Sequence, residues 1–332
     1  MMTTTSEAGA AGLRISLITV AWNHREEVDR FLAAISESQL DTHLSIELVL
    51  VDNNSTDDTA EYIASRHPWV VLVRNTVNAG FAQGCNDGLA KATGDFLMLL
   101  NPDAYANAGA LRGMAEFLRA RPDVGAVGCL LLHDDGLPQF SHYGEVGATT
   151  YLLHSSMFYP VMERLRKQAW RLGFGRSTAP QPCDWLMGSC IMVRRDVYNR
   201  AGGLEPAYFM YSEDADWCRR IRDAGFRIFH LPGFSMQHSQ KGSSRKRREF
   251  TFRRLYRNIV MYSQRHLSTV QQSRLKAMMI FDFQCRLIAY RILGLLKAGE
   301  REALGDRVKS VRLLLGVFRS GNIGLIDEQP PT

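Results

Sequence analysis

The sequence lacks the features that identify several common protein classes. Its six cysteines are scattered without a C-x-x-C pair, so we expect free buried thiols in a reducing compartment rather than a zinc site. No G-x-G-x-x-G follows the first apolar run, and no G-x-x-x-x-G-K-[ST] occurs, which removes the usual signals of dinucleotide and P-loop binding. The first residues carry neither the basic nor the apolar segment of a secretory signal.

Long apolar runs are also missing. A membrane-spanning helix needs about 20 consecutive, mostly apolar residues. The most apolar stretch near the C-terminus, residues 274–297, is interrupted by Asp282, Arg286 and Arg291. We therefore predict that this stretch does not span a membrane.

Charge, by contrast, is abundant and unevenly distributed. Residues 241–320 carry 19 Lys and Arg against 5 Asp and Glu, a net charge of +14, so the rest of the chain carries −8 of the total of +6. A basic segment attached to an acidic body predicts a polyanionic partner. Apolar stripes between its arginines are typical of an amphipathic helix on an anionic membrane surface.

Two other interpretations of the basic segment stay open at this point. A helical hairpin packed on the domain explains the apolar stripes equally well, and it does not exclude membrane binding. The run "RKRR" also suggests nucleic-acid binding. Because the aliphatic stripes suit lipid better than base stacking, we expect no nucleic acid as a partner.

The first 240 residues alternate apolar runs with helical patterns. Such strands predict an α/β fold with a parallel sheet that is covered by helices on both faces. The weaker pattern of residues 136–182 predicts an insertion or mobile loop. The strand-like runs lie at 15–22, 46–52, 69–75 and 94–103, and again within 183–198 and 224–239.

These patterns predict four segments. We expect a disordered tail over residues 1–13, an α/β domain over 14–240, a basic, helical, membrane-associating extension over 241–320, and a tail over 321–332.

Ligands of open α/β sheets bind beyond the carboxyl ends of the strands, and polar residues follow the predicted strands there. Asp103 in "LLNPDA" is a candidate ligand of Mg²⁺ or Mn²⁺, which take carboxylate and phosphate oxygens. The same Asn-Pro-Asp sequence also makes a simple turn. Asp52 or Asn53 is placed to bind the imide edge of a pyrimidine, or to cap the next helix.

The stretch "YSEDADWCRR" (211–220) gathers Glu213, Asp214 and Asp216 ahead of two arginines. Acids in a first helical turn and arginines in later turns are typical of a helix start. The crowding also raises the proton affinity of each carboxylate, which suits a general base. We expect Arg219 or Arg220 to limit the repulsion by pairing.

The order of the motifs identifies a resemblance to the family 2 glycosyltransferases of the GT-A fold, which are inverting enzymes that use nucleotide sugars. That fold implies a Rossmann-like, nucleotide-sugar-binding mixed sheet with helices on both faces. The resemblance covers roughly residues 14–245, and it is greatest to the rhamnosyltransferase branch that builds bacterial cell-surface glycans. The matching stretches are "VDNNSTDDT", "NAGFAQGCNDG", "LMLLNPDA", "WLMGSCIMVRR", "FMYSEDADWCRR" and "HLPGFSMQHS".

The resemblance implies a nucleotide-sugar site at the first strand ends. Two departures from the family pattern bear on it: Asn53 stands where many relatives have a second Asp, and Asn101 replaces the first Asp of the D-x-D element. Gly84 and Gly88, with Gly80, suggest close approach of the backbone to the ligand. The implied nucleotide-sugar residues are Val20, Ala21, Asp52, Asn53, Asn78, Gly80 and Asn101.

The resemblance also implies the residues of the reaction itself. Asp214 would be the general base, with Glu213 beside it in the catalytic acidic pair. Asp103 and His238 would bind Mg²⁺ or Mn²⁺. Trp185 and Gly188 would form the acceptor side, although Trp185 is as easily a core residue.

The function that these expectations describe is an inverting, metal-dependent glycosyltransferase of cell-wall or surface-polysaccharide synthesis. It would move L-rhamnose from dTDP-rhamnose to a hydroxyl group of a lipid-linked glycan, as a cytoplasmic protein bound peripherally to the inner face of the cell membrane. The alternatives are another sugar, such as galactofuranose or a hexose, from a UDP or GDP donor, and a catalytically silent sugar-nucleotide or glycan-binding protein. The oligomeric state stays open, a homo-oligomer included.

Overall fold

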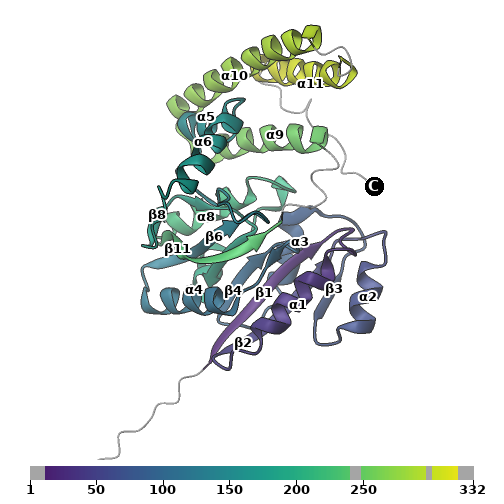
Figure 1. The fold of residues 1–332 in the computed structure, drawn as a ribbon, viewed down its shortest axis with the longest axis vertical. Coiled ribbons are helices and arrows are strands. Elements are labelled where there is room, and N and C mark those ends of the chain that lie inside the picture. Colours follow the sequence, from purple (N-terminus) through teal and green to yellow (C-terminus); the bar gives the residue numbers. More distant parts are fainter. Residues whose placement is uncertain (1–11, 240–247, 297–300, 321–332) are drawn as a thin grey trace, which may run out of the picture.

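A mixed β-sheet runs through the centre of the molecule (Figure 1). The computed structural model describes residues 12–239, 248–296 and 301–320, and in these the strands follow the order β3-β2-β1-β4-β10-β6-β11-β5, with β8 paired to β11. The strands are β1 (Leu13–Ala21), β2 (Leu44–Asp52), β3 (Val71–Arg74), β4 (Phe96–Leu100), β5 (Ala104–Tyr105), β6 (Val124–Leu132), β8 (Gln181–Cys183), β10 (Cys190–Arg194) and β11 (Arg227–His238).

The first four strands of the sheet run parallel, as predicted. β10 lies antiparallel to both β4 and β6, and β5 and β8 lie antiparallel to β11. The sheet is therefore mixed, as the resemblance to the GT-A fold implies, whereas the apolar strand pattern alone indicated only its parallel part. A strand buried on both faces is apolar throughout in either direction. Its sequence therefore carries no signal of its orientation.

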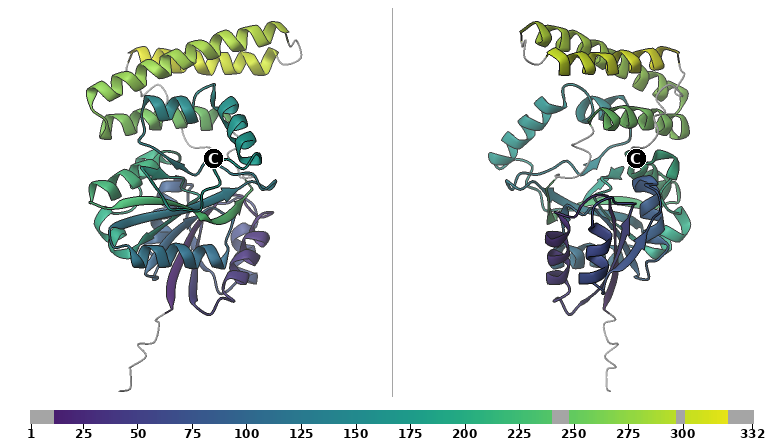
Figure 2. Two further views of the ribbon diagram at one scale, coloured as in Figure 1. Left: turned by 60° about the vertical axis from the view of Figure 1, so that its left-hand side comes forward. Right: turned by 90° about the vertical axis from the view of Figure 1, so that its right-hand side faces the viewer.

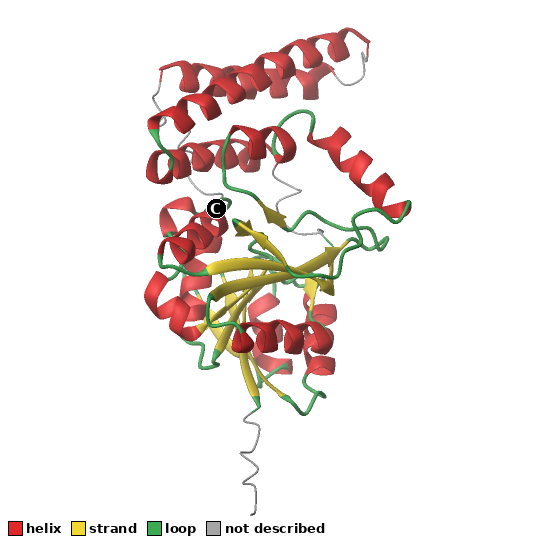
Figure 3. Ribbon diagram, turned by 90° about the vertical axis from the view of Figure 1, so that its left-hand side faces the viewer, coloured by secondary structure: helices red, strands yellow, loops and turns green. Residues whose placement is uncertain are grey.

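Helices cover both faces of the sheet (Figure 3). One face packs against α1 (Val28–Ser38), α2 (Thr59–Arg66) and α4 (Ala108–Ala120). The other packs against α3 (Gly80–Leu89), α7 (Arg195–Ala201) and α8 (Glu213–Asp223), which follows a short 3₁₀ helix, η1 (Pro206–Tyr208). Alternate residues of β1 face the two layers, because successive side chains of a strand point to opposite sides.

The insertion over 136–182 holds two helices, so its interpretation as a loop region is wrong. It contains β7 (His142–Tyr143), α5 (Ala148–His154) and α6 (Tyr159–Arg171). β7 pairs with β9 (Trp185–Leu186) in a small separate sheet. α6 has no buried residue, which explains why its pattern does not resemble that of a core helix.

The basic extension is helical, as predicted. It forms α9 (Arg248–His266), α10 (Thr269–Leu296) and α11 (Arg301–Ser320), which lie as a layer beyond the sheet (Figures 1 and 2). A reciprocal cap begins α10: Gln271 Oε1 accepts from the Ser268 N–H at 2.9 Å, and the Gln271 N–H lies 3.4 Å from Ser268 Oγ. The tails expected over 1–13 and 321–332, and the basic run at 241–247, lie almost wholly outside the described residues.

The extension packs on the domain through a hydrophobic cluster of its own. Tyr151 of α5, Tyr208 of η1 and Ala215 of α8 contribute to this cluster together with residues of α9, α10 and α11. The packed helical hairpin is therefore confirmed. In the described part of the chain, no helix is long and apolar enough to cross a membrane.

The cysteines agree with the expectation of free thiols. All six are free, and four of them are buried: Cys85, Cys129, Cys190 and Cys218.

Candidate active site

The carboxyl ends of β1 and β2 form the first part of the site. Ala21 and Asp52 are paired in register, and the Asn53 N–H donates to the Ala21 carbonyl at 2.8 Å. Asp52 is buried; its Oδ2 accepts from the Ser55 N–H at 3.2 Å, while its Oδ1 has no hydrogen-bond partner among the described residues. Asp52 thus keeps an acceptor for a ligand, beside the backbone of Val20 and Ala21.

Asn53 is fully engaged within the protein. Its Nδ2 donates to Asn78 Oδ1 at 3.0 Å and to the Gly80 carbonyl at 3.1 Å. Its Oδ1 accepts from Asn75 Nδ2 at 3.1 Å and from the Ala79 N–H at 3.2 Å. With two donors and two acceptor positions used, Asn53 shapes the loop before α3 and has no group left for a nucleobase.

The glycines of this region serve packing. Gly80 has φ +87°, and a Cβ there would lie 2.5 Å from the ring and the carbonyl of Phe209. Cβ atoms on Gly84 and Gly88 would lie 2.9 and 2.5 Å from side chains of β1. The close approach that we assigned to a ligand is therefore the approach of α3 to β1 and to the loop before α8.

Asp103 and His238 form a buried pair across β5 and β11. Each is 5% exposed, and His238 Nε2 lies 3.2 Å from Asp103 Oδ1. Burial alone would raise the pKa of Asp103, but the hydrogen bond and charge of His238, with His24 nearby, outweigh burial and hold this pKa below its usual value.

Gln139 determines which nitrogen of His238 carries a proton. Gln139 Nε2 donates to the His238 backbone carbonyl, so its Oε1 faces His238 Nδ1 at 2.7 Å, and Nδ1 must donate. The other nitrogen, Nε2, faces the Asp103 carboxylate, where it serves either as a proton donor to that carboxylate or, when unprotonated, as a second ligand of a cation. Adjacent ligands of an octahedral Mg²⁺ or Mn²⁺ lie about 3 Å apart, so the pair fits such an ion.

Other metal ligands would come from outside this pair. Among the described residues, no three His, Cys, Asp or Glu side chains are placed to share one ion. Asn101 Oδ1 is buried without a hydrogen-bond partner among the described side chains, and its N–H donates to the Ser189 carbonyl at 3.2 Å. Asn101 thus connects the end of β4 with the loop that carries Gly188.

Gly188 contacts the candidate base. Its N–H donates to Asp214 Oδ2 at 2.9 Å, and Asp214 Oδ1 accepts from the Ala215 N–H at 2.8 Å. A Cβ on Gly188 would lie 3.4 Å from Asp214 and from Phe81 of α3. The loop of Gly188, the candidate base Asp214 and the start of α3 therefore lie together.

The two residues of the acidic pair differ in exposure. Asp214 keeps part of its surface exposed, whereas Glu213 is 4% exposed and its Oε2 has no hydrogen-bond partner among the described residues. Burial, with the charges of Asp214 and Asp216, raises the pKa of Glu213 well above its usual value. Burial also raises the pKa of Asp214, against the effect of its backbone hydrogen bonds.

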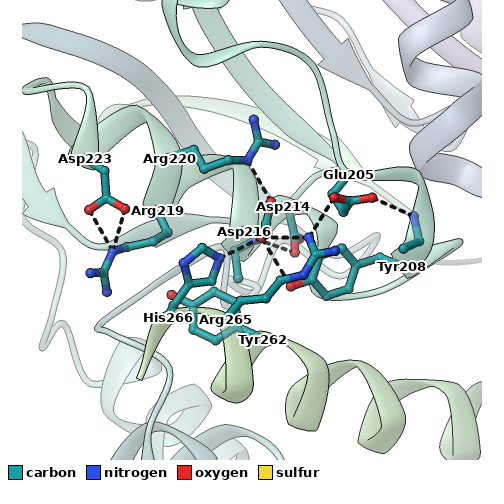
Figure 4. A network of polar contacts seen from close by, with 12 residues as sticks. Glu205, Tyr208, Asp214, Asp216, Arg219, Arg220, Asp223, Tyr262, Arg265 and His266 are labelled. Carbon is teal, nitrogen blue, oxygen red and sulfur yellow. Dashed lines mark hydrogen bonds and ion pairs between the residues drawn. The ribbon is translucent and has the colours of Figure 1, made fainter. Parts of the chain in front are cut away.

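Asp216 joins α8 to α9 (Figure 4). It is 1% exposed; its Oδ1 lies 2.7 Å from His266 Nε2 and accepts from Tyr208 Oη at 3.2 Å, and its Oδ2 accepts from Arg220 Nε at 2.8 Å. Arg220 thus limits the repulsion in the acidic cluster, as expected. Arg219 pairs instead with Asp223 and Glu145.

The loop before α8 is strained and is held by α9. Phe209, Tyr211 and Ser212 have φ values of +62°, +73° and +68°, a region that residues other than glycine seldom adopt. Asn258 of α9 is 0% exposed, and its Nδ2 lies 2.8, 2.7 and 2.7 Å from the carbonyls of Tyr208, Met210 and Tyr211. Asn258 therefore positions the backbone that leads to Asp214.

Trp185 lies in a stack rather than alone. Its ring lies parallel to that of Tyr143, with centroids 4.0 Å apart and an interplanar angle of 14°. Trp185 is partly buried and packs against both the sheet core and the cluster of the extension. Burial raises the pKa of Tyr143, and Gly188, three residues after Trp185, contacts Asp214.

Sequence reasoning missed Gln139, Tyr143 and Asn258. Each acts through a partner that is distant in the chain, and none stands in a motif. Asn258 lies within the basic extension, where the charge pattern indicated lipid binding only.

Comparison with known proteins places the chain among glycosyltransferases. Residues 16–202 match the family described as Glycosyl transferase family 2. The N-acetylglucosaminyl-diphospho-decaprenol L-rhamnosyltransferase of Mycobacterium tuberculosis is 26% identical over 244 residues, which are 69% of this chain and 77% of the relative. Rhamnosyltransferase WbbL of Escherichia coli is 23% identical over 244 residues, 68% of this chain and 83% of the relative.

A solved structure has the same fold. Mannosyltransferase PcManGT from Pyrobaculum calidifontis, in complex with GDP-Man and Mn²⁺, matches with a TM-score of 0.56 and 19% identity, covering 95% of this chain and 86% of that chain. The likeness confirms the predicted GT-A architecture. With the family match over more than half of the residues, the chain belongs to glycosyl transferase family 2 and is a glycosyltransferase.

Proposed function

We propose that this glycosyltransferase moves L-rhamnose from dTDP-rhamnose to a hydroxyl group of a lipid-linked glycan, with inversion at the anomeric carbon. The names of two relatives support the sugar, and one of these names includes a diphospho-decaprenol acceptor. One observation carries the proposal: Asp214 is a partly exposed residue, and its carboxylate is held by the Gly188 N–H in the loop that Asn101 joins to β4.

Asp214 acts as the general base. The acceptor hydroxyl oxygen forms the new bond to the anomeric carbon while the bond to the nucleoside diphosphate breaks, and Asp214 takes the hydroxyl proton. Each carboxylate oxygen accepts one backbone hydrogen bond and has a second lone pair for the acceptor. Burial raises the pKa of Glu213 beside it, which favours the neutral form and so a lower local charge.

Asp52, with the backbone of Val20 and Ala21, binds the nucleobase. The free Oδ1 of Asp52 accepts from the imide N–H of thymine or uracil. Asn53, Asn78 and Gly80 shape this pocket through their mutual hydrogen bonds.

Asp103 and His238 hold the divalent cation, Mg²⁺ or Mn²⁺, and Gln139 orients His238. The Mn²⁺ bound to PcManGT supports a divalent ion in this fold. When bound, such an ion neutralises charge that develops on the leaving diphosphate. Asn101, near the same strand end, has a free carboxamide oxygen for the donor or its hydration shell.

The acceptor side consists of Trp185 and Gly188, extended by Tyr143. The stacked rings present a flat surface of the kind that packs against a sugar face. The protein acts at the inner face of the cell membrane. Support comes from the basic extension and from exposed apolar residues of α10, namely Phe281, Ile288, Ile292, Leu295 and Leu296.

A donor screen tests the proposal. Purified protein is mixed with dTDP-rhamnose, UDP-galactofuranose, UDP-hexoses and GDP-hexoses, with and without a lipid-linked acceptor, and release of the nucleoside diphosphate is measured. Acceptor-dependent release from dTDP-rhamnose is expected. Release from another donor would show that the transferred sugar is not rhamnose. Binding of a donor without release of its nucleoside diphosphate would favour a sugar-nucleotide-binding protein without catalytic activity.

A further inference from the structure

Helix α6 carries its apolar stripe on the outside. Amphipathic helices of globular proteins turn their apolar side to the core, but no residue of α6 is buried. Phe158, Val161, Leu165 and Leu172 are 41%, 59%, 60% and 70% exposed. With about 3.6 residues per turn, these four lie within roughly 60° of one another on the helix surface. We call them the α6 stripe.

The less exposed side of α6 carries charged residues. Arg166 lies over the ring of Phe140, 3.0 Å from its centroid, and Lys167 pairs with Glu163 of the same helix at 3.0 Å. Arg164 and Arg171 are exposed beside the α6 stripe. A row of apolar side chains flanked by arginines is typical of a helix that lies in the interface of an anionic membrane.

The start of α6 is fixed to α10. Asp282 of α10 is 1% exposed; its Oδ1 accepts from the Met157 N–H at 2.7 Å and its Oδ2 from Tyr151 Oη at 2.7 Å. Arg286 Nε donates to Oδ2 at 2.7 Å and offsets the buried charge. α6 is therefore held in place although it projects from the body (Figure 2, teal).

The other side of α6 leads to the acceptor platform. Phe140, which contacts Arg166, lies 5.9 Å from Tyr143, and Tyr143 stacks on Trp185. A short path of aromatic side chains thus connects α6 with Trp185, three residues before Gly188, which contacts Asp214.

We propose that the α6 stripe inserts into the surface of an anionic lipid bilayer, with Arg164 and Arg171 at the headgroups, and sets the platform of Trp185 and Tyr143 next to that surface. A sugar at the membrane surface then reaches Asp214 while the lipid to which it is linked stays in the bilayer. The second part rests on the proposed function; the membrane contact itself does not.

Vesicle binding tests the membrane contact. The full chain and its Val161→Gln/Leu165→Gln variant are sedimented with phosphatidylcholine vesicles that contain phosphatidylglycerol, without substrate. We expect the partition coefficient of the variant to fall at least tenfold. The matched control, Leu40→Gln/Val71→Gln, alters exposed residues (80% and 40%) at the opposite edge of the sheet, near the starts of β2 and β3, and should bind as the unaltered chain does.

Two further measurements complete the test. With a water-soluble acceptor analogue, the α6 variant should transfer at the normal rate, because the α6 stripe touches no reacting group; with the acceptor embedded in vesicles its rate should fall about as much as binding. Unchanged vesicle binding by the α6 variant would overturn the proposal. So would a finding that the unaltered chain is a dimer without lipid and the variant is not, because the α6 stripe would then be a contact between two copies of the chain. Absence of transfer by the unaltered chain would contradict only the proposed function, since vesicle binding is measured without substrate.

Discussion

The backbone N–H of Gly188 donates a 2.9 Å hydrogen bond to Oδ2 of Asp214. The two residues are 26 positions apart, one in the loop after β9 and the other in the first turn of α8. This contact fixes the direction of the carboxylate and favours its ionised form, while burial opposes ionisation and prevails, so the pKa of Asp214 is raised. A base with a raised pKa accepts a proton more readily than an ordinary aspartate.

Replacement of the base should abolish transfer and spare binding. In Asp214→Asn, we expect the transfer rate to fall by roughly 10²–10⁴-fold, the usual contribution of a general base. The amide still accepts from Gly188 through its oxygen, so the donor should bind with nearly unchanged affinity in calorimetry. Asp223→Asn, at the far end of the same helix and paired with Arg219, is the matched control. Normal turnover in Asp214→Asn would exclude the assignment.

The pH dependence should show the raised pKa of Asp214. Because the base must be ionised, transfer should rise with pH and reach a plateau above its pKa, and the midpoint should lie above the value of about 3.9 for an ordinary Asp. The acid limb should vanish in the residual activity of Asp214→Asn. A midpoint at or below the ordinary value would contradict the environment that the structure gives this carboxylate.

Glu213 should affect stability more than chemistry. Its pKa is raised in the folded protein, so between the unfolded and folded pKa values the native state holds a proton that the unfolded chain releases. The free energy of unfolding then falls as pH rises, by up to about 1.4 kcal/mol per pH unit. Glu213→Gln mimics the protonated form and should remove this dependence while keeping most of the transfer activity. Denaturant unfolding at pH 5 and pH 8 measures the difference; equal slopes for both proteins would contradict it.

Loss of a proposed metal ligand, Asp103, should make the enzyme insensitive to added metal. In Asp103→Asn, we expect transfer to fall at least a hundredfold and Mn²⁺ binding, measured by electron paramagnetic resonance, to weaken, because a carboxylate is replaced by a neutral amide. Asp134→Asn, an exposed carboxylate near the end of β6 that accepts from Gln237, is the control. Full activity of the unaltered enzyme in EDTA would remove the ion from the reaction.

Asn258 should act on catalysis from the helix layer. Asn258→Ala leaves buried carbonyls of the strained loop without their donor, at a cost of about 1–3 kcal/mol in stability. At a temperature where the variant stays folded, kcat should fall roughly tenfold while donor binding is retained, since the nucleobase residues are untouched. Ser263→Ala removes a buried hydroxyl from the same helix that bonds only to the Val260 carbonyl. A loss of kcat as large in Ser263→Ala would show that α9 has a general structural role only.

Much of the fold could be predicted because local pattern determines it. The runs at 15–22 and 46–52 are β1 and β2 within two residues at each end, since apolar runs with polar flanks are unambiguous. The direction of β10 and the helices of the insertion could not be predicted. The first depends on which neighbour the strand meets, and α6 follows no rule for a core helix because its apolar side faces outward.

Some residues of the candidate site could likewise be predicted from the sequence, and others could not. Asp103, His238 and Asp214 stand in motifs, and the structure places Asp103 beside His238 and Asp214 beside Gly188. Asn53 also stands in a motif, yet its hydrogen bonds are used within the protein, which only the fold of the loop before α3 reveals. Asn258 has no local signal at all, because its partners lie about 50 residues away.

The hydrogen bonds of Asp216 limit how far the chain can be shortened at its C-terminal end. A shortened chain that ends at residue 240 would keep every residue that matches the family, yet Asp216 would lose the imidazole of His266 and the carbonyls before α8 would lose the amide of Asn258. Residues 16–202 therefore lack the contacts from α9 that hold the start of α8, and a shortened chain for crystallisation or screening should end after α9 at the earliest.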